Sequence, residues 1–129
     1  MSLHRETVTA ANAPAAVGAY SHAVRAGELL FCSGQVALDP SSGELVGDTP
    51  AEQARLALQN IAAVCEAAGT SLDRAVRCTL YVIDLPAAWG EVNEVYASFF
   101  ESDPPARVTI GVAGLPKGAL VEVDAVVAL

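Results

Sequence analysis

The sequence predicts an α+β fold, with one mixed sheet of five or six strands and two helices packed on one of its faces. Short segments rich in β-branched residues and bounded by turn residues indicate the strands. Only two segments show the apolar spacing of three and four residues that is typical of an amphipathic helix. The chain has 129 residues, of which 53% are hydrophobic, and this is enough for one core. We therefore expect a single domain over residues 1–129.

The N-terminal third predicts paired strands followed by a loop. Residues 18–36 contain two short strands, AYSHAV and LLFCSGQV, separated by a turn at Arg25–Glu28 that includes a glycine. A further strand is expected around residues 6–10. Leu38–Gly47 is dense in Pro, Ser and Gly, so we interpret it as a loop.

The first helix carries the clearest start signal. Thr49 is the expected N-cap, Pro50 takes the first helical position, and Glu52 completes a capping box. Gly69 is the expected residue just after the helix. Apolar residues then form one stripe, made of Ala54, Leu58, Ile61, Cys65 and Ala68.

The C-terminal half predicts a strand, a helix and two more strands. The strand covers Val76–Ile83, and the helix runs from about residue 86 to 100, ahead of two prolines. Arg107–Ala113 and Ala119–Leu129 are the last strands, and the short GLPKG connection predicts that they pair as a hairpin. The helix is expected to turn one set of residues inward, namely Trp89, Val92, Tyr96 and Phe99.

The strands are apolar on both faces. Leu30 and Cys32, for example, alternate with Leu29 and Phe31. Two helices can cover only one face of such a sheet, so the second face needs another cover. We therefore predict that copies of the chain associate through that face.

Composition narrows the possible partners and compartment. Seven Lys+Arg against 15 Asp+Glu give a net charge of −8, which disfavours nucleic-acid binding. No apolar stretch is long enough for a membrane span, and the N-terminus lacks the pattern of a signal peptide. Cys32, Cys65 and Cys78 are odd in number and lie in apolar surroundings, which indicates buried free thiols. We expect a cytoplasmic protein.

Polar residues in the predicted last hairpin are the best candidates for chemistry. Alternation puts the apolar side chains of both strands toward the helices, and it puts Arg107, Thr109, Glu122 and Asp124 together on the other face. An arginine and a carboxylate in a partly dry interface can bind a carboxylate substrate and move protons. The alternative is a structural salt bridge across the interface, which the pattern alone favours.

Other catalytic arrangements find little support. His4 and His22 have no Cys or His at metal-binding spacing, so no metal site is expected. We interpret His22, which falls in a predicted strand, as a structural or rim residue. The Ser33–Gly34 step allows a close approach of the backbone to a ligand or a β-bulge, and the bulge is preferred. Neither a nucleophile elbow nor a phosphate-binding glycine loop is present.

Several segments together resemble one known family. AYSHAVRAGELLFCSGQVALDPSSGELVG, NIAAVCEAAG, VNEVYASFF and PARVTIGVAGLPKGALVEVDAVV are similar, in order and in spacing, to the RidA/YjgF family of enamine/imine deaminases. The resemblance implies a chorismate-mutase-like fold and a homotrimer with its sites at the subunit interfaces. It also implies cofactor-free hydrolysis of 2-aminoacrylate and 2-aminocrotonate, as their imine tautomers, to 2-oxo acids and ammonia.

The resemblance also implies roles for individual residues. Arg107, in the PAR motif, would bind the substrate carboxylate through its planar fork. Glu122, in the VE motif, would activate water. The remaining substrate-binding positions are Tyr20, Ser33, Gly34, Asn93 and Thr109.

Two departures from the family pattern bear on substrate preference. Thr109 stands where the best-characterised members carry cysteine, and His22 replaces the glutamine of a YSQ motif that many members share. Two other functions therefore stay open. One is a trimer that binds 2-oxo acids or other small carboxylates without turnover. The other is an RNA-acting inhibitor of translation, which the acidic charge disfavours. No metal, cofactor, nucleic acid or membrane partner is expected.

Overall fold

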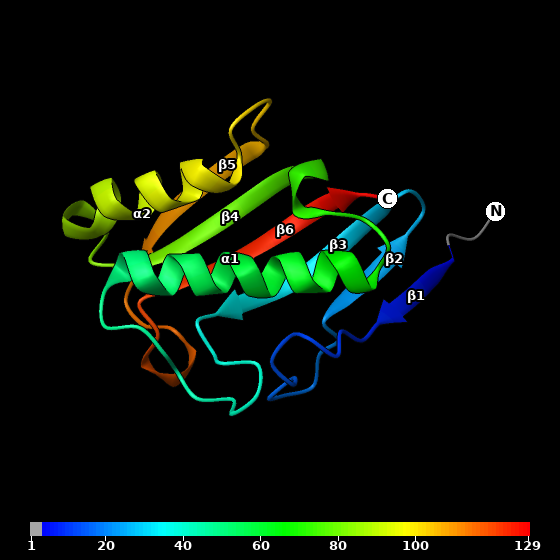
Figure 1. The fold of residues 1–129 in the computed structure, drawn as a ribbon, viewed down its shortest axis with the longest axis horizontal. Helices are drawn as coiled ribbons and strands as arrows, with labels where there is room; N and C mark the ends of the chain where they lie inside the picture. Colours follow the sequence, from blue (N-terminus) through cyan, green and yellow to red (C-terminus); the bar gives the residue numbers. More distant parts are fainter. Residues whose placement is uncertain (1–3) are drawn as a thin grey trace.

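The computed structural model describes residues 4–129 and has two helices on one face of a six-stranded mixed sheet (Figure 1). The strand order across the sheet is β1-β2-β3-β6-β4-β5. The predicted fold class, with its helix pair on one face, is confirmed. In chain order the elements are β1 (Arg5–Val8), β2 (Ala23–Ala26), β3 (Leu29–Val36), α1 (Pro50–Ala67), the 3₁₀ turn Leu72–Arg74, β4 (Ala75–Ile83), α2 (Leu85–Phe99), β5 (Ala106–Val112), the 3₁₀ turn Pro116–Gly118 and β6 (Val121–Ala128).

The last two strands do not form the predicted hairpin. Strand β5 pairs in parallel with β4, and α2 forms the crossover between them. Strand β6 pairs antiparallel with both β3 and β4 and so lies inside the sheet (Figure 1). The short connection between the two strands favours a hairpin. However, β6 is the strand whose helix-facing residues Val121, Val123 and Val127 are fully buried, and a central position gives them the most cover.

Helix α1 begins and ends where its sequence signals predict. The Thr49 hydroxyl accepts a hydrogen bond from the Glu52 amide at 3.1 Å, and the Glu52 carboxylate accepts one from the Asp48 amide at 2.6 Å. Gly69 follows the helix with a φ of +84°, a conformation that favours glycine. Leu58 and Ile61 of the predicted stripe are completely buried against the sheet. Local signals therefore determine this element.

The core lies between the helices and the sheet and contains all three cysteines. Cys32, Cys65 and Cys78 are buried free thiols, as predicted. Burial raises the pKa of the Cys78 thiol to about 11, so this sulfur stays protonated and packs as an apolar group.

The segment before β2 is a loop, although the sequence predicted a strand from residue 19. Strand β2 begins only at Ala23, so Tyr20 and His22 belong to the connection from β1. The His22 side chain bonds the backbone of Ala10 and Pro14, and these bonds hold the chain in a compact loop instead of an extended strand.

The face of the sheet opposite the helices is uncovered in the single chain. Phe31, Val108 and Ile110 on this face keep 45%, 43% and 42% of their surface exposed. The predicted pattern of a sheet that is apolar on both faces is therefore present. None of the helices in the described part of the chain combines the length and the apolar content that a membrane crossing requires.

Candidate active site

Four of the predicted site residues line one cavity at the start of β6. The cavity has a volume of about 220 Å³. Tyr20 comes from the loop before β2, Ser33 and Gly34 come from β3, and Glu122 comes from β6. We call this site the Glu122 cavity. Its other lining residues are Pro14, Ala15, Val17, Gln35, Val36, Leu38, Pro116 and Lys117.

Gly34 gives the Glu122 carboxyl group its space. The register of β3 against β6 shifts between Cys32 and Gln35, so the predicted bulge at this step is confirmed. A Cβ atom added to Gly34 would lie 2.9 Å from Cδ of Glu122, and still closer to one carboxylate oxygen. The missing side chain thus lets the β3 backbone pass directly over the carboxyl group.

The surroundings of Glu122 make its carboxylate a stronger base. Burial raises the pKa of Glu122, and the charge of Asp124 on the same face raises it further. Asp124 itself accepts a hydrogen bond from the Tyr81 hydroxyl at 3.0 Å. A carboxylate with a raised pKa takes up a proton more readily, which suits a general base.

Two hydroxyl groups of the cavity are held by backbone atoms. The Ser33 hydroxyl donates to the Ser21 carbonyl at 2.6 Å, and the Tyr20 hydroxyl accepts from the Val17 amide at 3.2 Å. The Tyr20 hydroxyl retains its own hydrogen as a donor.

Arg107 lies away from this cavity, at the edge of the sheet beneath α2. Its guanidinium carbon is 4.9 Å from the ring centre of Trp89 and 4.8 Å from that of Tyr96. Its Nη1 donates to Oδ1 of Asn93 at 2.8 Å. Trp89, Asn93 and Tyr96 are spaced by four and three residues, so they form one stripe of α2. We call Arg107 with this stripe the Arg107 platform, in which the rings and the amide restrain the guanidinium group.

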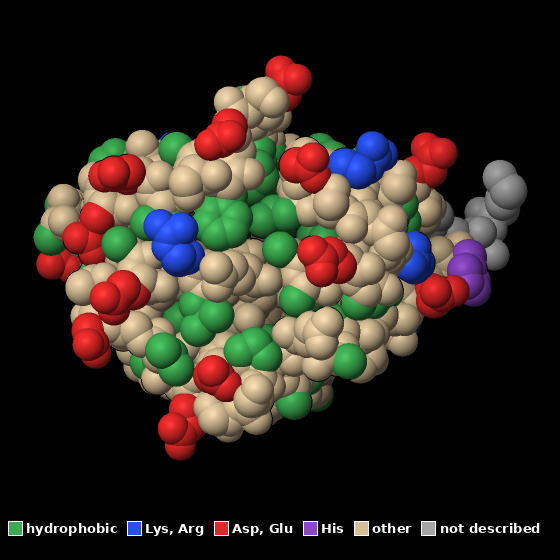
Figure 2. Space-filling model, viewed as in Figure 1, with side chains coloured by type: hydrophobic (Ala, Val, Ile, Leu, Met, Phe, Trp, Pro, Cys, Tyr) green, Lys and Arg blue, Asp and Glu red, His purple; other side chains and the backbone are tan. Residues whose placement is uncertain are grey.

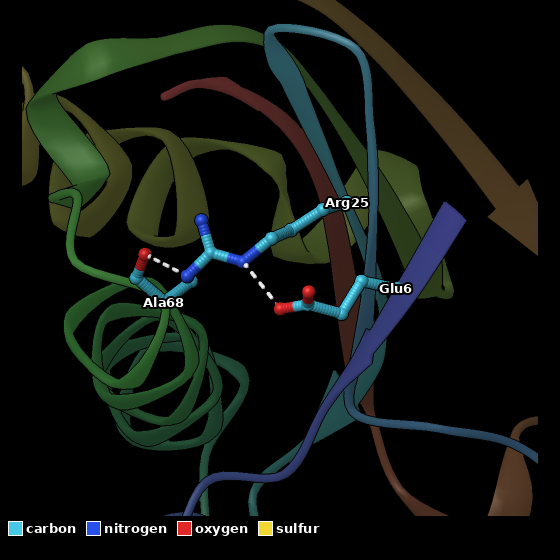
Figure 3. A network of polar contacts seen from close by, with 3 residues as sticks. All are labelled: Glu6, Arg25 and Ala68. Atoms are coloured by element: carbon cyan, nitrogen blue, oxygen red, sulfur yellow. Dashed lines mark hydrogen bonds and ion pairs between the residues drawn. The ribbon is translucent and has the colours of Figure 1, made fainter. Parts of the chain in front are cut away.

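The positive charge of Arg107 has no acidic partner among residues 4–129. Arg25 provides the contrast (Figure 3): its Nε lies 3.4 Å from Oε1 of Glu6, and its Nη2 donates to the Ala68 carbonyl at the end of α1. Arg25 is therefore a structural residue that joins β1, β2 and α1. In the described part of the chain, the ion pair between Arg107 and Glu122 is not formed. Arg107 is thus available to an anion from outside the chain.

Arg107 and Glu122 point to opposite faces of the sheet, so the prediction that they share a face is wrong. Arg107 pairs with Cys78, which is buried under the helices, whereas Glu122 pairs with Tyr81 on the uncovered face. The Cα atoms of Arg107 and Glu122 are separated by two strand spacings and three residues, roughly 14 Å. The same correction applies to Thr109, which faces the helix side with Arg107, while Asp124 stays with Glu122.

The physical reason for this correction is the pairing of β5. Its register follows β4 and not β6, and this register turns Val108 and Ile110 to the uncovered face. Thr109 instead lines a hollow on the helix side, together with Leu85, Pro86 and Trp89.

The predicted site residues therefore form two groups. Tyr20, Ser33, Gly34 and Glu122 meet at the Glu122 cavity, and Asn93 contacts Arg107 on the platform. Sequence reasoning missed Trp89, which it assigned to the helix interior, although 37% of its surface is exposed. The helical spacing of two aromatic residues around an asparagine was the available signal, and a core-packing interpretation concealed it.

Comparisons with known proteins agree with this architecture. A family model described as Endoribonuclease L-PSP matches residues 10–129. The RutC family protein y4sK of Sinorhizobium fredii is 44% identical over 124 residues, covering 96% of this chain and 98% of that protein. The 2-iminobutanoate/2-iminopropanoate deaminase of Homo sapiens is 42% identical over 125 residues, covering 97% of this chain and 90% of the relative.

Solved structures extend the likeness to three dimensions. A protein of the conserved Rid family, YyfA from Yersinia pestis, superposes with a TM-score of 0.93 at 37% identity, covering 98% of this chain and 100% of that one. TdcF from E. coli, solved with bound serine, gives a TM-score of 0.89 at 34% identity and covers 96% of this chain and 98% of its own. The fold, together with this likeness in sequence, defines a Rid-type protein. The chain belongs to the RidA/YjgF family.

Proposed function

We propose that this protein is a cofactor-independent deaminase that hydrolyses 2-imino acids, formed from 2-aminoacrylate or 2-aminocrotonate, to 2-oxo acids and ammonia. One observation carries the proposal. Among residues 4–129, Arg107 has no acidic partner and Glu122 has a raised pKa in a cavity, and the two lie on opposite faces of the sheet. Relatives that are 41% and 42% identical to this chain are named 2-iminobutanoate/2-iminopropanoate deaminases, whereas one that is 44% identical carries the name RutC family protein.

The two half-sites complete each other when copies of the chain associate. The Glu122 cavity of one subunit then meets the Arg107 platform of the next. Because the two surfaces differ, this contact is heterologous, and a heterologous contact that closes gives a ring. The exposed apolar residues of the uncovered face, including Phe31 and Ile110, supply surface to bury in that ring. The family resemblance supports a ring of three subunits.

The proposed reaction follows from the charges at the two half-sites. Arg107 holds the carboxylate of the imino acid in a bidentate grip, while Asn93 and the aromatic rings restrain the guanidinium group. Glu122 removes a proton from a water molecule, the resulting hydroxide adds to the imine carbon, and the protonated Glu122 returns the proton to the nitrogen of the opened C=N bond. In the tetrahedral carbinolamine the hydroxyl proton moves to the nitrogen, the C–N bond breaks, and ammonia leaves the 2-oxo acid. Fixing the substrate between two subunits supplies the orientation that this addition requires.

A second function, binding without turnover, is favoured by one observation. The related TdcF was solved with bound serine, so a small amino acid can occupy a family member as a ligand. In that case Arg107 would bind a 2-oxo acid, and Glu122 would not act as a base. Release of ammonia from freshly generated 2-aminoacrylate separates the two functions, because a binding protein leaves the uncatalysed rate unchanged.

The Endoribonuclease name of the family model raises RNA as a third possibility. Acidic side chains are scattered over the helix-bearing face, and basic ones stand apart from one another (Figure 2). The net charge of −8 also disfavours binding to the phosphates of RNA. RNA binding that weakens with salt would favour the RNA function over the deaminase.

Mixed assemblies test the proposal that each site spans two subunits. Assemblies of Arg107→Lys subunits alone, or of Glu122→Gln subunits alone, are each expected to lose most of their activity. Co-assembled at equal amounts, they should regain activity, because about a quarter of the randomly formed interfaces combine an intact Arg107 with an intact Glu122. Light scattering should report a mass near three times 13.2 kDa. An active monomer, or a mixture without regained activity, would exclude a shared site.

A further inference from the structure

His22 bonds the backbone at two points of the loop between β1 and β2. Its Nδ1 accepts from the Ala10 amide at 2.8 Å, and its Nε2 lies 2.8 Å from the Pro14 carbonyl oxygen. A backbone N–H group can only donate and a backbone carbonyl can only accept. The hydrogen of the imidazole ring is therefore on Nε2. The side chain is only 6% exposed. A buried ring with both nitrogen atoms engaged is a fixed brace for the loop.

This loop forms one wall of the Glu122 cavity. Pro14, which accepts the bond from His22, lines the cavity itself, and so do Ala15, Val17 and Tyr20 further along the same loop. The backbone carbonyl of His22 accepts a hydrogen bond from the Ser33 amide of β3 at 3.0 Å. Ser33 is the neighbour of Gly34, which lies over Glu122. His22 thus joins the loop wall of the cavity to its β3 wall without lining the cavity.

We propose that His22 is a positioning residue for substrate binding, which holds residues 10–20 so that Tyr20 and Pro14 stay against the Glu122 cavity. The proposal rests on the proposed function for its effect on substrate. The hold on the loop itself is independent of that function.

The side chain of glutamine provides a matched test, because its amide also offers one acceptor and one donor. We expect His22→Gln to retain both bonds and His22→Ala to lose both. Thr70→Val is the control variant. The Thr70 hydroxyl donates to the Ala128 carbonyl at 2.7 Å, six residues along β6 from Glu122 and roughly 20 Å away.

Substrate affinity and amide exchange are the two measurements. In His22→Ala, the KM for the imine and the Kd for 2-oxobutanoate should rise about tenfold, while kcat changes by less than about threefold. Hydrogen exchange at the Ala10 amide should accelerate in the same variant. His22→Gln and Thr70→Val should keep the affinity within about twofold of the wild type and keep Ala10 protected.

Several outcomes would overturn the proposal. One is a His22→Ala variant with native affinity and a protected Ala10 amide, and another is a His22→Gln variant as impaired as His22→Ala. Should His22→Ala fail to fold, NMR of the wild-type ring decides instead, because the proposal requires hydrogen on Nε2 and none on Nδ1. A wild-type protein that neither binds 2-oxobutanoate nor releases ammonia removes the proposed function. Ala10 exchange then still tests whether His22 holds the loop.

Discussion

The Glu122 cavity and the Arg107 platform are built in different ways. Irregular backbone makes most of the cavity: a loop braced by His22, a bulge in β3 and a 3₁₀ turn at Pro116–Gly118. Regular elements make the platform, where one stripe of α2 lies against an edge strand. The course of the backbone therefore shapes the space around the Glu122 carboxyl group, whereas contacts between side chains hold the Arg107 guanidinium group. The first region should respond to changes in backbone shape and the second to changes in side-chain chemistry.

The largest effect is expected for Glu122, the proposed general base in the cavity. Glu122→Gln keeps the shape of the side chain but removes its basicity, so kcat should fall about 100- to 1000-fold, the contribution of a positioned general base. Binding of a 2-oxo acid should persist or tighten slightly, because a negative charge leaves the site. Stopped-flow ammonia release and calorimetry measure the two quantities. A variant that retains full kcat would remove Glu122 from the mechanism.

Arg107→Lys should give the next largest loss. The variant keeps the charge but replaces a planar fork with a flexible point charge. The bidentate grip on the substrate carboxylate and the contacts of the guanidinium group with the rings of Trp89 and Tyr96 are both lost. We therefore expect kcat/KM to fall about 100-fold. The affinity for pyruvate should fall with it, and the trimer should remain. If the trimer dissociates while activity per assembled site is unchanged, Arg107 is an assembly residue and not a substrate ligand.

The opposite faces of Arg107 and Glu122 mark the limit of sequence reasoning about the site. Alternation in β6 predicts its buried side chains correctly, because β6 is central and one of its faces lies under the helices. In β5 the same reasoning fails. Val108 and Ile110 are apolar although their face of the sheet is uncovered and does not face the core. Parity within a strand shows which residues share a face, but only the pairing partner shows which face that is.

The fold, too, could be predicted only where nearby residues determine it. Both helices, the caps of α1 and the bulge at Ser33–Gly34 depend on nearby residues, and the sequence predicts them. The insertion of β6 between β3 and β4 depends on contacts between segments far apart in the chain. The loop nature of Tyr20–His22 likewise depends on hydrogen bonds to Ala10 and Pro14. Contacts between segments far apart in the chain produce no periodic pattern in the local sequence, so the sequence does not predict them.

Gly34→Ala tests whether backbone shape positions the base. The new Cβ would lie 2.9 Å from Cδ of Glu122, so either the carboxyl group or β3 has to move. We expect kcat to fall about tenfold, with the affinity for 2-oxo acids less affected. A crystal structure of the variant should show a displaced Glu122 side chain. The matched control is Gly90→Ala on α2, where an added Cβ meets no neighbouring atom and activity should be native.

The pH dependence should report the raised pKa of Glu122. The base works only when ionised, so activity falls as the pH is lowered through the pKa of its carboxyl group. Burial raises that pKa, so the acid limb of kcat/KM should lie above the ordinary glutamate value of about 4.3. Glu122→Gln should lack this limb. A limb at or below the ordinary value would show that the cavity stays hydrated in the assembled protein.

The smallest effect is expected at Thr109, on the platform side of the comparison. Thr109 faces the helix side and lines a hollow with Leu85, Pro86 and Trp89, and it lies two residues from Arg107. In the proposed reaction, water attacks the imine carbon under the control of Glu122, so no nucleophile is needed at position 109. Thr109→Cys should therefore leave deaminase activity within about tenfold, a barrier change of about 1.4 kcal/mol.

A gain of several orders of magnitude in Thr109→Cys would mean that the wild-type chain lacks a group the reaction needs. The protein would then be a relative that binds without hydrolysis. Thr109→Ser is the control, because it keeps the hydroxyl and removes only a methyl group. If Ser and Cys variants both stay near the wild-type rate, the departure at this position adjusts the lining of the site, and the chemistry stays with Arg107 and Glu122.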